Sequence, residues 1–112
     1  VLGVPASYWY DLEDRQPLDA ARALDVPVLA LFGGRDYQVP EADAARWERA
    51  LAGRQRAEVV RVSNADHLFR PGTGMATPND YTSRAANVDA AVIDRIARFV
   101  LALPPAPSPS RD

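Results

Sequence analysis

Two residues suited to proton transfer each follow a run that is typical of a β-strand. Asp36 comes after the apolar residues 27–32 and a double-glycine turn, and His67, the one histidine, comes after the β-branched residues 58–62. Parallel strands place ligand-binding and catalytic groups beyond their carboxyl ends, so neighbouring strands would bring both side chains to one edge. There the carboxylate can accept Nδ1–H of the imidazole, fix its tautomer and stabilise it during proton transfer. The spacing therefore predicts an acid–base pair.

The elements that must hold this pair form a predicted strand–helix–strand unit. Residues 27–32 are continuously apolar, as in a strand that is covered on both faces. Residues 41–52 are predicted to be a helix whose buried stripe is Ala44, Trp47, Ala50 and Leu51. A crossover of this kind is right-handed and makes the strands near 27–32 and 58–62 parallel. The fold class is therefore α/β.

The flanking segments are less regular. Residues 1–16 show no period, Pro5 and Ser7 are expected to interrupt any helix, and the aromatic residues 8–10 form either a hydrophobic plug or a pocket wall. A short helix is predicted over 17–24 and a long loop over 64–81, of a length that usually carries function. A long amphipathic helix is predicted from about 87 to 103. The domain is therefore 1–103, and 104–112 is predicted to be a disordered Pro/Ser-rich tail.

The run PVLALFGGRDYQVP, the later ADHLF and the long helix that follows resemble the C-terminal third of an α/β-hydrolase. More narrowly, residues 7–101 resemble the branch of bacterial esterases, acyl-thioesterases and dienelactone-hydrolase-like proteins, where an SYW-like segment precedes the acid strand. In that family the catalytic residues follow the order Ser, Asp or Glu, His. The resemblance implies that Asp36 is the acid and His67 the base. Residues that line an acyl pocket or pack beneath the loop are then Tyr37, Leu68, Phe69 and Met75.

The nucleophile of that family has no counterpart here. The sequence lacks a G-x-S-x-G turn, and no serine stands in a glycine-flanked turn between a strand and a helix; the serines are Ser7, Ser63, Ser83, Ser108 and Ser110. The chain also begins Val-Leu-Gly-Val. We therefore expect a C-terminal fragment, inactive alone, with the remainder of the hydrolase domain upstream. The alternative is a non-catalytic remnant or interaction module that pairs with another chain through its unpaired strand edge.

Three charged residues near the pair have open roles. Arg35 either braces the loop or pairs with a carboxylate, or it lies on the solvated surface, which is the favoured interpretation. Asp66 is a poor rival acid, since neighbouring side chains diverge, and is expected to cap the loop or face solvent. Asp43 lies within the predicted helix and is expected on the surface.

Composition excludes several other functions. With no cysteine and one histidine there is no disulfide, thiolate zinc site or cysteine nucleophile, and no metal site is expected. All 13 basic residues are arginine, which excludes lysine chemistry. The net charge of −2 argues against a nucleic-acid partner, and no apolar run approaches the ~20 residues of a membrane span. We expect no cofactor, a small-molecule ester or thioester substrate and a cytoplasmic protein.

Overall fold

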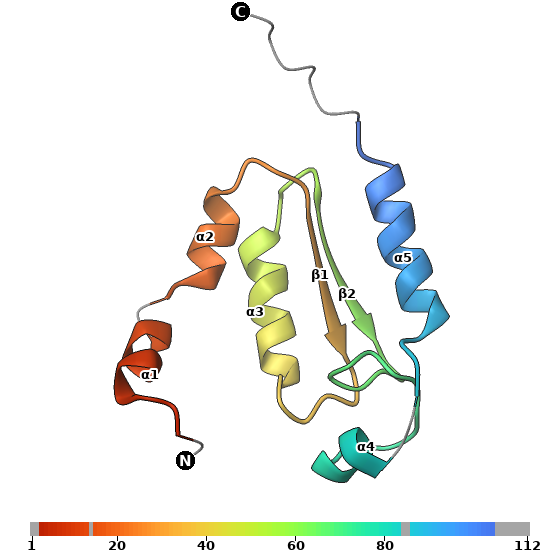
Figure 1. The fold of residues 1–112 in the computed structure, drawn as a ribbon. Coiled ribbons are helices and arrows are strands. Elements are labelled where there is room, and N and C mark those ends of the chain that lie inside the picture. Colours follow the sequence, from red (N-terminus) through yellow and green to blue (C-terminus); the bar gives the residue numbers. More distant parts are fainter. Residues whose placement is uncertain (1–2, 14, 84–85, 105–112) are drawn as a thin grey trace, which may run out of the picture.

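The computed structural model describes residues 3–13, 15–83 and 86–104, and a βαβ unit lies at its centre (Figure 1). Strand β1 (Val28–Gly33) leads through helix α3 (Glu41–Leu51) to strand β2 (Ala57–Val62). The strands are parallel and pair from Val28 with Ala57 to Gly33 with Val62. The predicted strand–helix–strand unit is confirmed, with strand boundaries within one residue of those expected.

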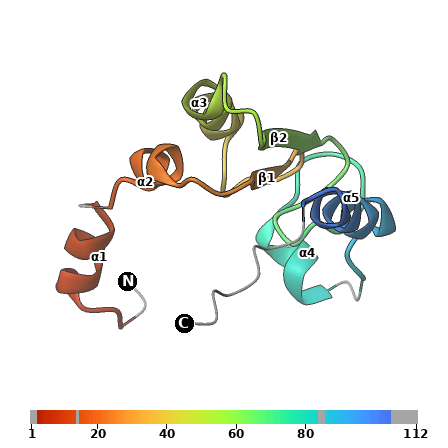
Figure 2. The same cartoon turned by 90° about the horizontal axis from the view of Figure 1, so that it is seen from above.

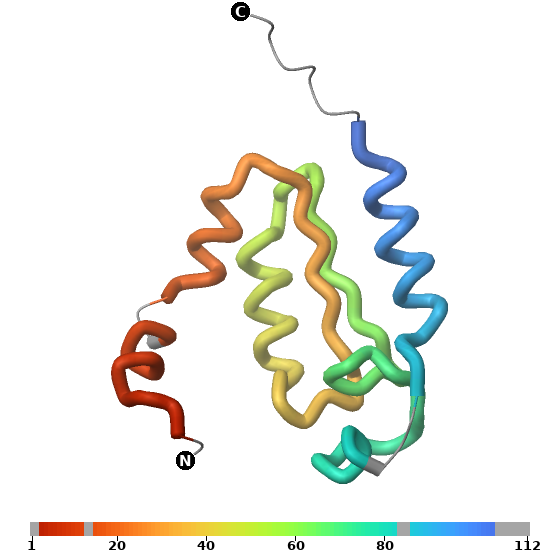
Figure 3. The backbone as a smooth tube through the Cα atoms, in the orientation of Figure 1, coloured from red at the N-terminus to blue at the C-terminus, as the bar shows by residue number. Residues whose placement is uncertain are grey.

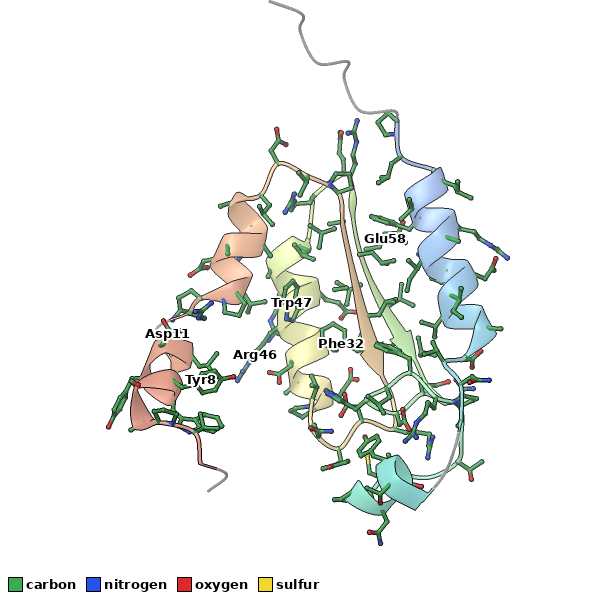
Figure 4. The ribbon with its side chains drawn as sticks, viewed as in Figure 1. Tyr8, Asp11, Phe32, Arg46, Trp47 and Glu58 are labelled. Carbon is green, nitrogen blue, oxygen red and sulfur yellow. The ribbon has the colours of Figure 1, made fainter. Side chains whose placement is uncertain are left out.

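The helices lie on both sides of this small sheet (Figure 2). Helix α3 covers one face, and α4 (Pro78–Ser83) and α5 (Ala90–Leu101) lie on the other, while α2 (Pro17–Ala23) and α1 (Ala6–Glu13) extend away beyond β1. Glu58 points from β2 toward α5, where its carboxylate pairs with Arg95 (Figure 4). At the start of β1, the half-buried Arg54 donates to the carbonyls of Ala21, Leu24 and Val26 and so ties α2 to the sheet.

Local sequence signals explain three of the helix ends. Pro17 occupies the first turn of α2, where its missing N–H has no helical partner to lose. Gly53, at φ 81°, follows α3 in the left-handed region that glycine tolerates. Asp89 caps α5 because its side chain accepts from the amide of Ala91 at 2.9 Å. Helix α5 is therefore shorter than the predicted 87–103.

Two helices were not predicted from the sequence. Helix α1 forms in residues that were expected to be irregular. Pro5 lies before its first residue and Ser7 lies in its first turn, and at these positions neither residue breaks a helix. Helix α4 interrupts the predicted loop 64–81. Its start carries a capping-box signal, since the Asp80 carboxylate accepts from both the amide and the hydroxyl of Thr77. All of the predicted tail except Pro104 lies outside the described residues.

The apolar surface of the unit is incompletely covered within the described part of the chain. Every residue of β1 is half-buried, although its sequence is that of a strand covered on both faces. The buried apolar residues are mostly small: Ala21, Ala44, Ala50, Leu51, Ala65, Ala76 and Val92. Large apolar side chains are exposed on α1 and α5: Tyr8, Trp9, Tyr10, Leu12, Ile93, Ile96, Val100 and Leu101. The aromatic residues 8–10 therefore form no buried plug. The Cα radius of gyration is 17.2 Å, against about 13 Å for a compact 100-residue domain.

Helices long and apolar enough to span a bilayer are absent from the described residues.

Candidate active site

The structure brings Asp36 and His67 into contact at the carboxyl ends of the two strands. Asp36 lies in the turn after β1 and His67 in the turn after β2, and the two turns lie side by side (Figure 3). The Nδ1 atom of His67 is 2.9 Å from Oδ2 of Asp36. The Asp36 side chain is 6% exposed and the imidazole 40% exposed. The carboxylate is thus shielded while the imidazole stays accessible.

Hydrogen bonds to both carboxylate oxygens fix the orientation of Asp36. Its Oδ1 accepts from the amides of Gln38 at 2.7 Å and Val39 at 3.1 Å, which leaves Oδ2 for His67. Burial acts to raise the pKa of Asp36, but the hydrogen bonds from His67, Gln38 and Val39 and the charge of His67 together hold it below its usual value. Asp36 is therefore ionised at neutral pH and selects the Nδ1–H tautomer of His67.

The double glycine at the end of β1 allows the two turns to approach. A Cβ atom on Gly33 would lie 2.6 Å from the carbonyl oxygen of Asp66, and one on Gly34 would lie 2.7 Å from that of Ser63. Any other residue would push the acid turn away from the loop that carries His67. The amide of Gly34 also donates to the Val62 carbonyl at 2.8 Å, which continues the strand pairing into the turn.

A buried ion pair holds the histidine loop from within. The Asp66 side chain is 3% exposed, and its Oδ1 accepts from the amides of Leu68 and Arg70 at 2.9 and 3.0 Å. Its Oδ2 pairs with Nε of Arg70 at 3.0 Å. Phe69 between them has φ 56°, an uncommon conformation for a bulky residue. Asp66 thus caps the loop, which was one of its two predicted roles, and it does not face solvent.

The two other charged residues near the pair, Arg35 and Asp43, differ in their burial. Arg35 is 7% exposed, so the favoured surface interpretation was wrong, and its guanidinium instead braces the loop through the carbonyls of Gly74, Asn64 and Arg70. Asp43 lies on α3 as predicted and pairs with Arg46 at 3.1 Å, with 37% of its side chain exposed.

Two hollows adjoin the pair. A small cavity of about 140 Å³ is lined by Asp36, His67 and Phe69 together with the end of β1. A wider one, of about 360 Å³, is lined by Asp36, Tyr37 and Met75 among others, and the Tyr37 ring lies 5.9 Å from that of Tyr81. Leu68 lines neither and is 47% exposed.

A third hollow lies outside this site. Phe32 and Trp47 both line a space between α2, α3 and the end of β1, and Arg46 points from α3 toward α1 (Figure 4).

Candidate nucleophiles and metal ligands are scarce. Ser7 lies in α1, Ser63 directly follows β2, and Ser83 ends α4, so no described serine joins a strand to a helix. Ser108 and Ser110 lie outside the described residues. The described residues contain no group of three or more side chains that could hold a metal ion.

The lowered pKa values of Asp36 and Asp66 predict how the site responds to acid. Burial acts to raise the pKa of Asp66, but hydrogen bonds from Arg70 and Leu68 hold it below its ordinary value of 3.8, in the same direction as Asp36. Each of these carboxylates stabilises the folded state fully at pH values above 3.8, its ordinary pKa. This stabilisation is lost as the pH falls through the lower pKa that the group has in the folded state. We expect the amide proton signals of Gln38, Val39, Leu68 and Arg70 to titrate with midpoints below 3.8. Midpoints at or above 3.8 would show that these contacts do not form.

Comparison with known proteins points to one group. A family model described as "Dienelactone hydrolase family" matches residues 4–99. Esterase EstD of Thermotoga maritima is 44% identical over 101 residues, which is 90% of this chain and 24% of that protein. Proteins named "Putative carboxymethylenebutenolidase" from Salmonella typhimurium and Escherichia coli are 37% and 34% identical over 71 residues, which is 59% of this chain and 26% of each.

The chain thus spans about a quarter of the length of these relatives. No solved structure matches it significantly.

Proposed function

The chain belongs to the dienelactone hydrolase family, and from this we propose that it forms the C-terminal part of a serine hydrolase that cleaves carboxylic esters or thioesters. The observation that carries the proposal is the 2.9 Å contact between Asp36 Oδ2 and His67 Nδ1, made from two adjacent strand ends. In this proposal the chain supplies the acid and the base, and the nucleophilic serine comes from outside residues 1–112.

The proposed mechanism follows from the tautomer that Asp36 selects. With its Nδ1–H bonded to the carboxylate, His67 has a free Nε2 lone pair that can take the proton of a serine hydroxyl. The serine oxygen then attacks the carbonyl carbon of the substrate. The resulting imidazolium returns the proton to the leaving alcohol or thiol, and an acyl-enzyme remains. His67 next deprotonates a water molecule, whose oxygen attacks the acyl carbonyl carbon. The imidazolium then returns this proton to the serine oxygen as the serine–acyl bond breaks and the acid leaves, and Asp36 stabilises the imidazolium in both steps.

The hollows beside the pair support a role for neighbouring side chains in substrate binding. Tyr37 and Phe69 each line a hollow that also contains Asp36, so we propose that they contact the acyl or alcohol part of the substrate. Leu68 is exposed beside His67 and is proposed to lie at the rim of the completed pocket.

The uncovered surface supports the proposal that the remainder of the domain lies elsewhere. Among the described residues, β1 pairs with β2 alone, which leaves its second edge open. Aromatic and aliphatic side chains are also exposed on α1 and α5. The matched part is about a quarter of each relative, so the relatives hold ample further sequence to cover these surfaces. The same open edge is what favours the second candidate, a non-catalytic module that pairs with another chain.

An activity assay tests the proposal. A longer protein that contains residues 1–112 should hydrolyse p-nitrophenyl acetate or an acyl thioester, and the 112-residue chain alone should not. Hydrolysis by the short chain alone would show that the nucleophile lies within it. A longer protein with no activity toward either class of substrate would favour the non-catalytic module.

The open edge gives a further expected outcome. The isolated chain should self-associate, because the free edge of β1 and the exposed faces of α1 and α5 can be covered by a second copy. Sedimentation velocity over a range of concentrations measures this. A monomer at every concentration, with a sharp cooperative thermal transition, would contradict it.

A further inference from the structure

Arg35 is a buried cation beside the acid, and the mechanism proposed above gives it no step. It follows Gly34 and precedes Asp36, and it is 7% exposed. Burying a guanidinium is costly unless its donors are satisfied, so the partners of Arg35 show what the residue does.

The partners of Arg35 all lie on the segment that carries His67 or immediately follows it. Its amide donates to the Ala65 carbonyl and its own carbonyl accepts from the Ala76 amide, each at 2.9 Å. Its Nε donates to the Gly74 carbonyl at 2.6 Å. Its Nη1 lies 3.5 Å from the carbonyl oxygens of Asn64 and Arg70, which stand on either side of His67 in the chain. One residue therefore connects the acid turn to both ends of the histidine turn.

The loop is shaped around the guanidinium. A Cβ atom on Gly72 would clash with Nη1 of Arg35 and lie 2.5 Å from its Cζ, so a side chain at this position would displace the guanidinium. Hydrogen bonds from Thr77 chiefly lower the pKa of Asp80, and the positive charges of Arg35 and Arg70 lower it further, so an ionised carboxylate stands near the buried cations.

We propose that Arg35 is a positioning residue that holds the Asp36 carboxylate and the His67 imidazole at hydrogen-bonding distance. The proposal rests on the function proposed above. Arg35 directly precedes Asp36 in the chain, and its guanidinium is hydrogen-bonded to carbonyls on both sides of His67. Displacing the guanidinium therefore moves the two turns relative to each other. A lysine would keep the charge but could not present a planar fork to three carbonyls.

Arg54 provides a matched control. Like Arg35, it donates from its guanidinium to three backbone carbonyls, but these lie at the opposite end of β1. Arg35→Lys and Arg54→Lys therefore remove the same kind of brace, and only the first brace adjoins the acid–base pair. Gly72→Ala is a second test, since it displaces the Arg35 guanidinium without changing Arg35 itself.

The tautomer of His67 is the readout, because the Nδ1–H form depends on the contact with Asp36, and Arg54→Lys controls for a general loss of stability. His67 is the one histidine, so ring-¹⁵N labelling gives its signals alone, and magic-angle-spinning NMR reads them whatever the size of the assembly. At about pH 9, where imidazole side chains are ordinarily neutral, the unaltered chain should show the Nδ1–H form. Arg35→Lys and Gly72→Ala should lose most of that signal, as Asp36→Asn should, and Arg54→Lys should keep it.

The outcomes separate the two proposals. Arg35→Lys and Gly72→Ala spectra that match the Arg54→Lys spectrum would overturn the positioning role, whatever the enzyme does. In a longer, active protein, Arg35→Lys should lower kcat by about 10- to 100-fold with little change in KM, and a kcat equal to that of Arg54→Lys would also overturn it. An altered tautomer in a longer protein without hydrolase activity would retain the positioning role and reject the proposed function.

Discussion

Replacing His67 with alanine should reduce kcat for ester hydrolysis by about 10⁴- to 10⁶-fold in a longer protein that supplies the nucleophile. The imidazole is the group proposed to take the serine proton and return it to the leaving group. Among the described residues no second histidine could take over this transfer. Steady-state kinetics with p-nitrophenyl acetate measure the loss.

The fold should survive this substitution. The imidazole is 40% exposed, and among the described residues its one hydrogen bond is to Asp36, so alanine removes little packing. The melting temperature of His67→Ala should therefore stay close to that of the parent. A folded variant with near-normal kcat would remove His67 from the mechanism.

The second large effect is expected at Asp36. Asp36→Asn should lower kcat by about 10⁴-fold, because the wrong tautomer of His67 is then favoured. The amides of Gln38 and Val39 donate to Oδ1, so an asparagine would keep its carbonyl oxygen there and turn its NH₂ group toward Nδ1 of His67. That arrangement places the imidazole proton on Nε2, where the lone pair is needed.

Asp43→Asn is the matched control for this substitution. Asp43 also lies in the segment between β1 and β2, but it belongs to α3 and pairs with Arg46. No described contact joins it to His67. The control should keep kcat within a factor of about two, since surface substitutions are nearly neutral. Equal kcat values for the Asp36 and Asp43 variants would show that Asp36 does not orient the base.

The sequence was sufficient to predict the centre of the fold and the pair. An unbroken apolar run before Gly-Gly, and a β-branched run before the histidine, predicted two parallel strands whose ends meet, because such patterns depend on local burial and strand length. The contact between Asp36 and His67 then followed from topology, without knowledge of any side-chain packing.

The remainder depended on features that residue type alone does not reveal. Helix α1 was missed because Pro5 and Ser7 were treated as helix breakers, although both stand at the helix start. Helix α4 was missed although the Thr77–Asp80 spacing of a capping box was present. The burial of Arg35 and Asp66 could not be foreseen, since charged residues are mostly exposed. The carbonyl partners of Arg35 lie 29 to 39 residues away in the chain, and Asp66 is neutralised by Arg70 inside the same loop.

The central claim is that Asp36 and His67 serve a serine located outside residues 1–112, and fluorophosphonate labelling of a longer protein tests it most directly. Peptide mapping should find the label on a serine outside residues 1–112. The labelling rate should fall by about 10³-fold or more in His67→Ala, since the serine loses its general base. A label on a serine within residues 1–112, or an equal labelling rate in a folded His67→Ala variant, would contradict the account.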